Sequence, residues 1–256
     1  MLANGQNDRR LLVTFTGEPF QPVRLTYVVP NRPRVLEILR RLACVVEVPK
    51  ERCWQWQFAG EAACLRFGGG GYEDVPEEKR PVLLARLRFP RSGGMTLETN
   101  SIDRAIAAAR FFGPRFGTAA TATRCRVVNR CFADGEGDIA RLLKRLDENV
   151  VVIDPQKAEE RFRRDFRHVR GIEDANRAAA ASLERRIATR EDVPEVEDLP
   201  LAPEEETADF RHLQLTLGLR GLRALERWNG NTDLTLVALI VRLVKDGSLS
   251  LPDVAG

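Results

Sequence analysis

The sequence predicts an α+β protein, in which a ferredoxin-like or related sheet carries helices on one face and is followed by a C-terminal helical region. Three observations predict this class. Segments with the two-residue period of half-buried strands recur through the first 132 residues. Two stretches of helical period interrupt these segments, and helical period dominates after residue 135.

Strands are predicted wherever apolar and polar residues alternate along the chain. Alternation of this kind places one row of side chains in a core and the other row in solvent. The alternating segments are residues 10–16, 23–29, 53–58, 63–67, 82–89 and 121–132, and a short segment at 150–155 adds a last strand.

The two helices of this region begin at recognisable start signals. The first has Pro33 in its first turn, and the second has Asn100 as its N-cap and ends at Gly113 and Pro114. Each helix follows a strand, so the sequence holds two similar strand–helix units. A ferredoxin-like sandwich needs this twofold element order, with helices on one face of the sheet and the other face open.

Four parts follow one another along the chain. They are an α+β sheet domain at 1–153, a helical extension at 154–190, an acidic linker at 191–209 and a C-terminal helical hairpin at 210–256. The linker has three prolines, many acidic residues and no basic residue. The hairpin is too small to form its own core. It therefore docks on the sheet domain or forms a surface for a partner protein or for self-association.

Composition limits the classes of function. The 256 residues are 43% hydrophobic, and the longest apolar run, LTLVALIV, is far shorter than the roughly 20 residues of a membrane span. With no readable secretory signal, we expect a cytoplasmic protein without a membrane partner. The five cysteines form no C-x-x-C pair and only two histidines are present. We therefore expect no metal, no cofactor and no histidine-centred catalytic group.

Charge is divided unevenly along the chain. Residues 1–150 hold 24 basic and 17 acidic residues, whereas residues 151–256 hold 16 basic and 20 acidic residues. Arginine supplies 35 of the 40 basic residues. Two explanations of this excess remain open. One is codon bias, and the other is recognition of phosphate or carboxylate, which the planar guanidinium suits.

The arginines recur at alternating positions of the predicted strands. On the 121–132 strand they share a face with Val128 and Phe132. If the strands belong to one sheet, the arginines point to the same side and form an anion-binding surface. Its candidate residues are Arg24, Arg66, Arg86, Arg88, Arg124, Arg126 and Arg130.

Two interpretations of this arginine face remain open. It is the solvated side of an antiparallel sheet, which is ordinarily polar, or it is a platform for an anionic partner. The aromatic pattern of RNA-recognition sheets is absent, which favours a phosphate or carboxylate ligand over stacked bases. The acidic linker is itself long enough to lie along this face and screen it.

For function, we expect a non-catalytic binding or assembly protein. It would use the arginine face for an acidic protein partner and the helical hairpin for protein docking. The alternative is a nucleic-acid-binding module that contacts the RNA or DNA backbone. A metal-dependent nuclease comes third, because Asp74, Glu77 and Lys79 supply the residue types of such a site but lie together in one loop.

Overall fold

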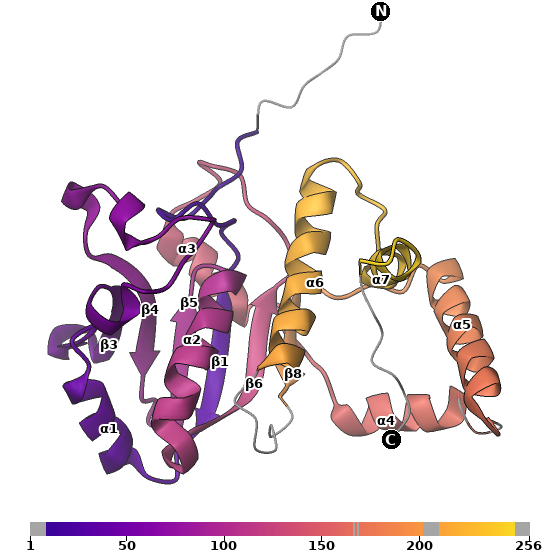
Figure 1. The fold of residues 1–256 in the computed structure, drawn as a ribbon, viewed down its shortest axis with the longest axis horizontal. Helices are drawn as coiled ribbons and strands as arrows, with labels where there is room; N and C mark the ends of the chain where they lie inside the picture. The colour runs from indigo at the N-terminus through magenta and orange to yellow at the C-terminus, as the bar shows by residue number, and fades with distance from the viewer. Residues whose placement is uncertain (1–8, 166, 168, 202–209, 249–256) are drawn as a thin grey trace, which may run out of the picture.

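In the computed structural model, one eight-stranded sheet runs through the molecule, and helices pack against it (Figure 1). The structure describes residues 9–165, 167, 169–201 and 210–248. The strand order is β2-β3-β4-β5-β1-β6-β8-β7, and neighbouring strands are antiparallel except for β7 and β8. The strands are β1 (Val23–Val28), β2 (Val45–Val48), β3 (Cys53–Phe58), β4 (Val82–Arg88), β5 (Met95–Thr99), β6 (Thr121–Val128), β7 (Val151–Val152) and β8 (Val196–Pro200).

The helices divide into a group on the sheet and a group beyond it (Figure 1). Helix α2 packs against β1, β5 and β6, with α1 and α6 beside it, whereas α5 contacts α4 and α7. The chain is therefore an α+β protein whose sheet is larger than the four strands of a ferredoxin-like sandwich. The helices are α1 (Arg32–Arg41), α2 (Ile102–Phe116), α3 (Ile139–Lys144), α4 (Pro155–Asp165), α5 (Ile172–Ala188), α6 (Arg211–Trp228) and α7 (Leu236–Lys245).

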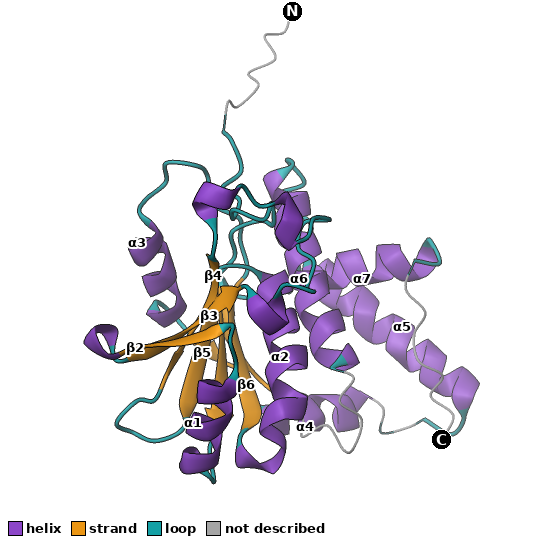
Figure 2. Cartoon of the chain, turned by 60° about the vertical axis from the view of Figure 1, so that its left-hand side comes forward, coloured by secondary structure: helices purple, strands orange, loops and turns teal. Residues whose placement is uncertain are grey.

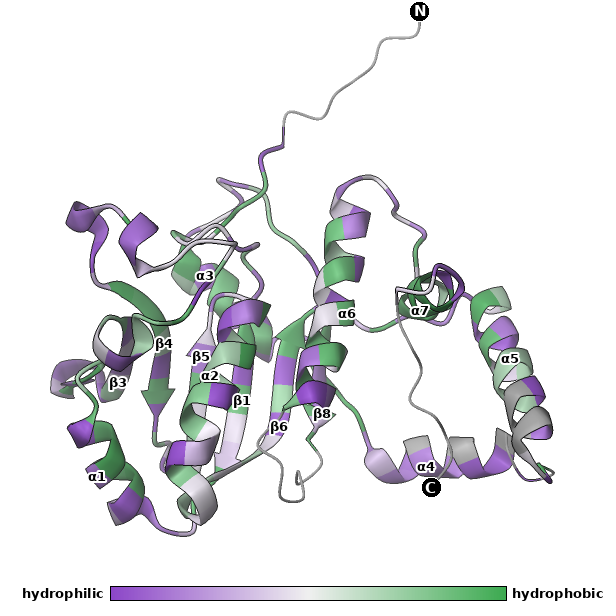
Figure 3. Cartoon of the chain, viewed as in Figure 1, coloured by the Kyte–Doolittle hydropathy of each residue, from purple (hydrophilic) through white to green (hydrophobic). Residues whose placement is uncertain are grey.

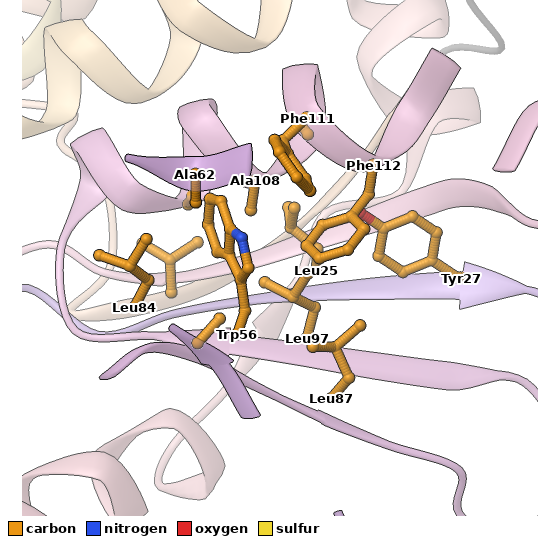
Figure 4. Packing of buried hydrophobic residues seen from close by; sticks show 14 of the residues in the cluster. Leu25, Tyr27, Trp56, Ala62, Leu84, Leu87, Leu97, Ala108, Phe111 and Phe112 are labelled. Atoms are coloured by element: carbon orange, nitrogen blue, oxygen red, sulfur yellow. The ribbon is translucent and has the colours of Figure 1, made fainter. Parts of the chain in front are cut away.

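The main core lies between the sheet and α2. Trp56 is fully buried and stands among small and aliphatic residues beneath that helix (Figure 4). Its ring centroid lies 5.2 Å from that of Phe111 and 5.3 Å from that of Phe112, both on α2. Aromatic pairs at this separation stabilise a core beyond the area that they bury. The face of the sheet below α2 is therefore a packed interior.

The second face of the sheet is not fully open, contrary to the sequence prediction. Figure 2 shows α3 on the side of the sheet away from α2. Leu142 of α3 and Leu146 after it are buried in a second core with Phe20, Val128 and Phe132. Because Val128 and Phe132 are apolar residues on the arginine side, burying them requires a cover there. Helices therefore lie on both faces.

The predicted acidic linker is in part a strand of the sheet. Its residues Val196–Pro200 form β8, which pairs with β6 and extends the sheet past residue 153. Val196 and Leu199 are buried, and the carboxylate of Asp198 meets arginines of β6. Apolar burial and ion pairing thus fix a segment that composition alone presents as a linker. Residues 202–209 of the predicted linker lie outside the described residues.

The C-terminal hairpin docks on the sheet domain, which was one of the two predicted outcomes. Leu213 and Leu217 of α6 are buried in the main core. Asp192 accepts hydrogen bonds from Arg223 and Arg227 of α6 and from the amide of Leu236 at the start of α7. One carboxylate therefore holds both helices of the hairpin to the segment that leads into β8.

Hydropathy differs between the outer helices. Helix α7 is mostly apolar, whereas the described residues of α4 are mostly hydrophilic (Figure 3). Within the described parts of the chain, no helix combines the length and apolar character needed to cross a membrane.

Candidate functional site

Five of the seven predicted arginines lie on one face of the sheet, and we call these five the sheet-face arginines. Cross-strand pairing places Arg86 opposite Glu98, Glu98 opposite Arg24 and Arg24 opposite Arg126. Directly opposite residues share a face. Two residues further along the same strands, Arg88 and Arg124 occupy the next row. The sheet-face arginines are Arg24, Arg86, Arg88, Arg124 and Arg126.

Carboxylates of the chain itself contact the sheet-face arginines on the β4 side. Glu98 of β5 lies 2.7 Å from the guanidinium of Arg24 and 3.0 Å from that of Arg88. Arg86 has a longer contact, 3.8 Å, to Glu51. Glu98 therefore links the two strands that flank β5, namely β1 and β4.

Two further carboxylates contact the arginines on the β6 side. Asp198 of β8 lies 2.7 Å from Arg124 and 2.9 Å from Arg126. Asp147, which follows α3, lies 2.6 Å from Arg24 and 2.8 Å from Arg126. The hydrogen bonds from Arg24 hold the pKa of Asp147 below its usual value, so this carboxylate stays charged. An external anion would have to compete with these internal carboxylates.

Arg66 and Arg130 lie off the sheet face. Residues 63–67 do not form the strand that their alternation predicts. Phe67 makes an isolated bridge to Gly70, because the chain turns back on itself there. Arg66 is therefore in a loop, 3.2 Å from Glu73. Arg130 follows β6 and forms an ion pair with Glu136. The sequence placed both on the sheet, whereas the structure places them on loops.

A groove with a volume of 490 Å³ lies along α2, and we call it the α2 groove. One wall is α2 itself, whose lining residues recur at helical spacing over about 18 Å. The opposite wall comes from the loop at 61–66 and from Gln214 of α6. The residues of α2 that line it are Asp103, Ile106, Ala107, Arg110, Phe111 and Arg115.

Three arginines line the α2 groove, and one of them, Arg66, forms the ion pair with Glu73. The other two, Arg110 and Arg115, differ from the sheet-face arginines in their partners. Arg110 donates to the side-chain oxygen of Gln214 at 2.5 Å. Arg115 donates to the carbonyl of Phe111 at 2.6 Å and stacks over its ring at 3.8 Å. Among the described residues, neither guanidinium forms an ion pair with a carboxylate. The partners of these two guanidiniums, the Gln214 side chain and the Phe111 carbonyl and ring, are neutral.

The α2 groove also carries negative charge. The Glu61 carboxylate accepts hydrogen bonds from the backbone amides of Ala43 and Cys44, each at 3.0 Å. These amides, that of Ala43 foremost, lower the pKa of Glu61 to about 2. Asp103 lies at the N-terminal end of α2 on the same groove. The groove thus presents charges of both signs.

The hydrogen bonds of Glu61 predict a pH dependence of stability. A carboxylate whose pKa is lowered by folding stabilises the fold above its unfolded pKa of about 4.3, and this contribution is lost as the pH falls. We expect the Glu61→Gln variant to lose less stability than the wild type between about pH 4.5 and pH 2. Urea unfolding at several pH values measures this difference, and parallel curves for the two proteins would contradict it.

The three residues with the types of a nuclease site lie in two successive short turns. The Asp74 carboxylate accepts a hydrogen bond from the backbone amide of Gly71 at 2.7 Å and so closes a local turn. Glu77 and Lys79 lie in the separate short turn Glu77–Lys79. In the portion of the chain that the structure describes, no group of three or more His, Cys, Asp or Glu residues could hold a metal ion.

Comparison with protein-family models, with curated proteins and with solved structures found no match to this chain. The candidate site is therefore inferred from the geometry of its own residues.

Three residues of the α2 groove were not predicted as site residues from the sequence. Arg110 lies on the second predicted helix, whereas Arg115 lies beyond the predicted end of that helix at Gly113 and Pro114. In the structure α2 continues through Pro114 to Phe116 and includes Arg115. Nothing local in the sequence distinguishes either arginine from a solvated one. Gln214 lies 104 residues away from Arg110 along the chain. Their juxtaposition arises only when α6 docks on α2, and no period in the sequence carries that information.

Proposed function

We propose that this chain is a non-catalytic binding protein that captures an acidic partner in the α2 groove. The observation that supports this proposal is that Arg110 and Arg115 line a 490 Å³ groove without a carboxylate partner among the described residues. Charge-assisted hydrogen bonds from arginine to carboxylate are stronger than neutral ones. Volumes of this size are typical of ligand sites.

The sheet-face arginines are the weaker candidates for the same role. Displacing Asp198 from Arg124 and Arg126 would leave a nearly buried carboxylate, 9% exposed, without its cations. Leaving such a buried charge without its partners costs several kcal/mol. Arg110 of the α2 groove carries no such cost, because its partner is a neutral amide.

We also propose that the inner part of the sheet is a ferredoxin-like core. Strands β4, β5, β1 and β6 lie in this order and are antiparallel, and β5, α2 and β6 form a unit that straddles β1. This is the split β-α-β arrangement of that fold class. The pairs β2–β3 and β8–β7 would then be additions at its two edges.

In this proposal the helical hairpin contributes to the site rather than standing apart from it. Helix α6 packs on α2 and places Gln214 on the groove.

The five cysteines are free thiols, which suits a reducing compartment such as the cytoplasm.

A binding measurement tests the proposed function. We expect a fluorescein-labelled peptide of six glutamates to bind the wild type, with binding that weakens as salt is added. Arg110→Gln and Arg115→Gln should each weaken it by about tenfold, since a hydrogen bond to a charged group contributes about 1.5–3 kcal/mol. Fluorescence anisotropy measures the affinity.

The matched control is Arg88→Gln on the sheet face. Arg88 is 39% exposed and shares Glu98 with Arg24, so its loss should change binding less than twofold. Binding that depends on Arg88 and not on Arg110 would refute the groove as the site. Retention of single-stranded nucleic acid but not of the peptide would favour the alternative class.

A further inference from the structure

The apolar part of the α2 groove lining, which we call its floor, comes from both walls. Leu65 and Ile106 are half-buried, pack against the main core and line the groove together with Ala107 and Phe111. A ligand that offered only charge would leave this floor in contact with water. Burial of a large apolar side chain there is favourable in proportion to the area removed from water.

The charges of the groove discriminate between classes of anion. Arg110 and Arg115 attract a carboxylate or a phosphate, whereas the ionised Glu61 repels a chain that is negative along its whole length. A nucleic acid is such a chain, with a phosphate at every nucleotide. A peptide can carry an uncharged residue between its acids, so it can place its acids at the arginines and a neutral side chain beside Glu61.

Gln214 leaves Arg110 available to a carboxylate of the ligand. Its side-chain oxygen accepts a hydrogen bond from Arg110 at 2.5 Å, so the guanidinium is oriented by a neutral partner. A glutamate of the same shape at this position would form an ion pair with Arg110. The identity of a single exposed side chain therefore decides whether Arg110 is available to a ligand.

From these observations we infer that the ligand of the α2 groove is an acidic peptide segment that carries a large apolar side chain beside its carboxylates. This inference rests on the proposed function and deepens it. The apolar side chain lies on the floor formed by Leu65 and Ile106, and the carboxylates lie against Arg110 and Arg115.

Three labelled peptides test the inference by fluorescence anisotropy with the full chain. They are the peptide of six glutamates, the same peptide with one central phenylalanine, and a version of the latter with glutamine at every glutamate. We expect the acidic phenylalanine peptide to bind at least tenfold more tightly than the other two. Gln214→Glu should weaken its binding about tenfold, with unchanged circular dichroism and unfolding midpoint.

Ile106→Asn separates the inference from the proposed function. In this variant the phenylalanine peptide should bind no more tightly than the peptide of six glutamates. Equal affinities for the two acidic peptides would overturn the inference while the proposed function stands. Equal binding of the neutral peptide, or no binding of any peptide, would overturn both. Tighter binding of a single-stranded oligonucleotide that Gln214→Glu abolishes would overturn the inference.

Discussion

Replacing Glu18 by Gln should lower the free energy of unfolding by about 3–5 kcal/mol, because it leaves a buried arginine without its counter-charge. Glu18 is 1% exposed and Arg104 of α2 is 2% exposed. Their nearest charged atoms are 2.9 Å apart. The hydroxyls of Thr14, Thr16 and Ser101 also donate to the Glu18 carboxylate. The pair thus anchors the N-terminal segment to the start of α2.

The same pair sets a pH dependence. Burial raises the pKa of Glu18, but Arg104 and the hydroxyls of Thr14 and Thr16 together lower it below its usual value. Its contribution is therefore present above about pH 4.3 and lost as the pH falls below that value.

Chemical unfolding in urea measures the effect of Glu18→Gln. The double variant Glu18→Met with Arg104→Met is the control, since replacing both charges by apolar groups removes the unpaired ion. We expect the double variant to be more stable than Glu18→Gln. A loss below about 1 kcal/mol in Glu18→Gln would contradict the structural role of the pair.

The second large effect is expected at Asp198. Asp198→Ala should cost roughly 2–4 kcal/mol, somewhat below the value for a fully buried pair, because Arg124 and Arg126 are 30% and 24% exposed. The variant leaves these two guanidiniums without the carboxylate that joins β8 to β6. We expect faster hydrogen exchange of the β8 amides in addition to the lower stability.

Asp147→Ala is the matched control for Asp198→Ala. Asp147 contacts Arg24 and Arg126 but is 57% exposed, so its removal should cost no more than about 1 kcal/mol. Equal losses for the two aspartates would show that burial does not decide the strength of these pairs. Unchanged exchange of the β8 amides in Asp198→Ala would contradict the role of Asp198 in holding the strand.

Several elements could be predicted because their signals are local. Helix α1 begins near Pro33 as predicted, and β1, β3 and β4 fall within alternating segments. Strands β2 and β5 were not predicted, because four or five residues give too few alternations. Composition predicts a linker where β8 lies, because the arginines of β6 that pair with Asp198 lie more than 70 residues earlier in the chain.

The candidate site could be predicted only in part. Alternation correctly grouped the sheet-face arginines, because a two-residue period fixes the face of a strand. It did not indicate that Glu98, Asp147 and Asp198 would pair with them, since these acids come from three separate segments. The α2 groove depends on the docking of α6 and of the loop at 61–66, and such docking is a property of the whole fold.

One NMR titration tests whether the sheet-face arginines are engaged internally while Arg110 and Arg115 of the α2 groove are available to a ligand. Titration of the acidic phenylalanine peptide into ¹⁵N-labelled protein, followed through the arginine Nε–Hε signals by NMR, reports on both sets at once. We expect shifts for Arg110 and Arg115 and unchanged signals for Arg124 and Arg126. Shifts of Arg124 and Arg126 with unchanged signals from Arg110 and Arg115 would contradict it.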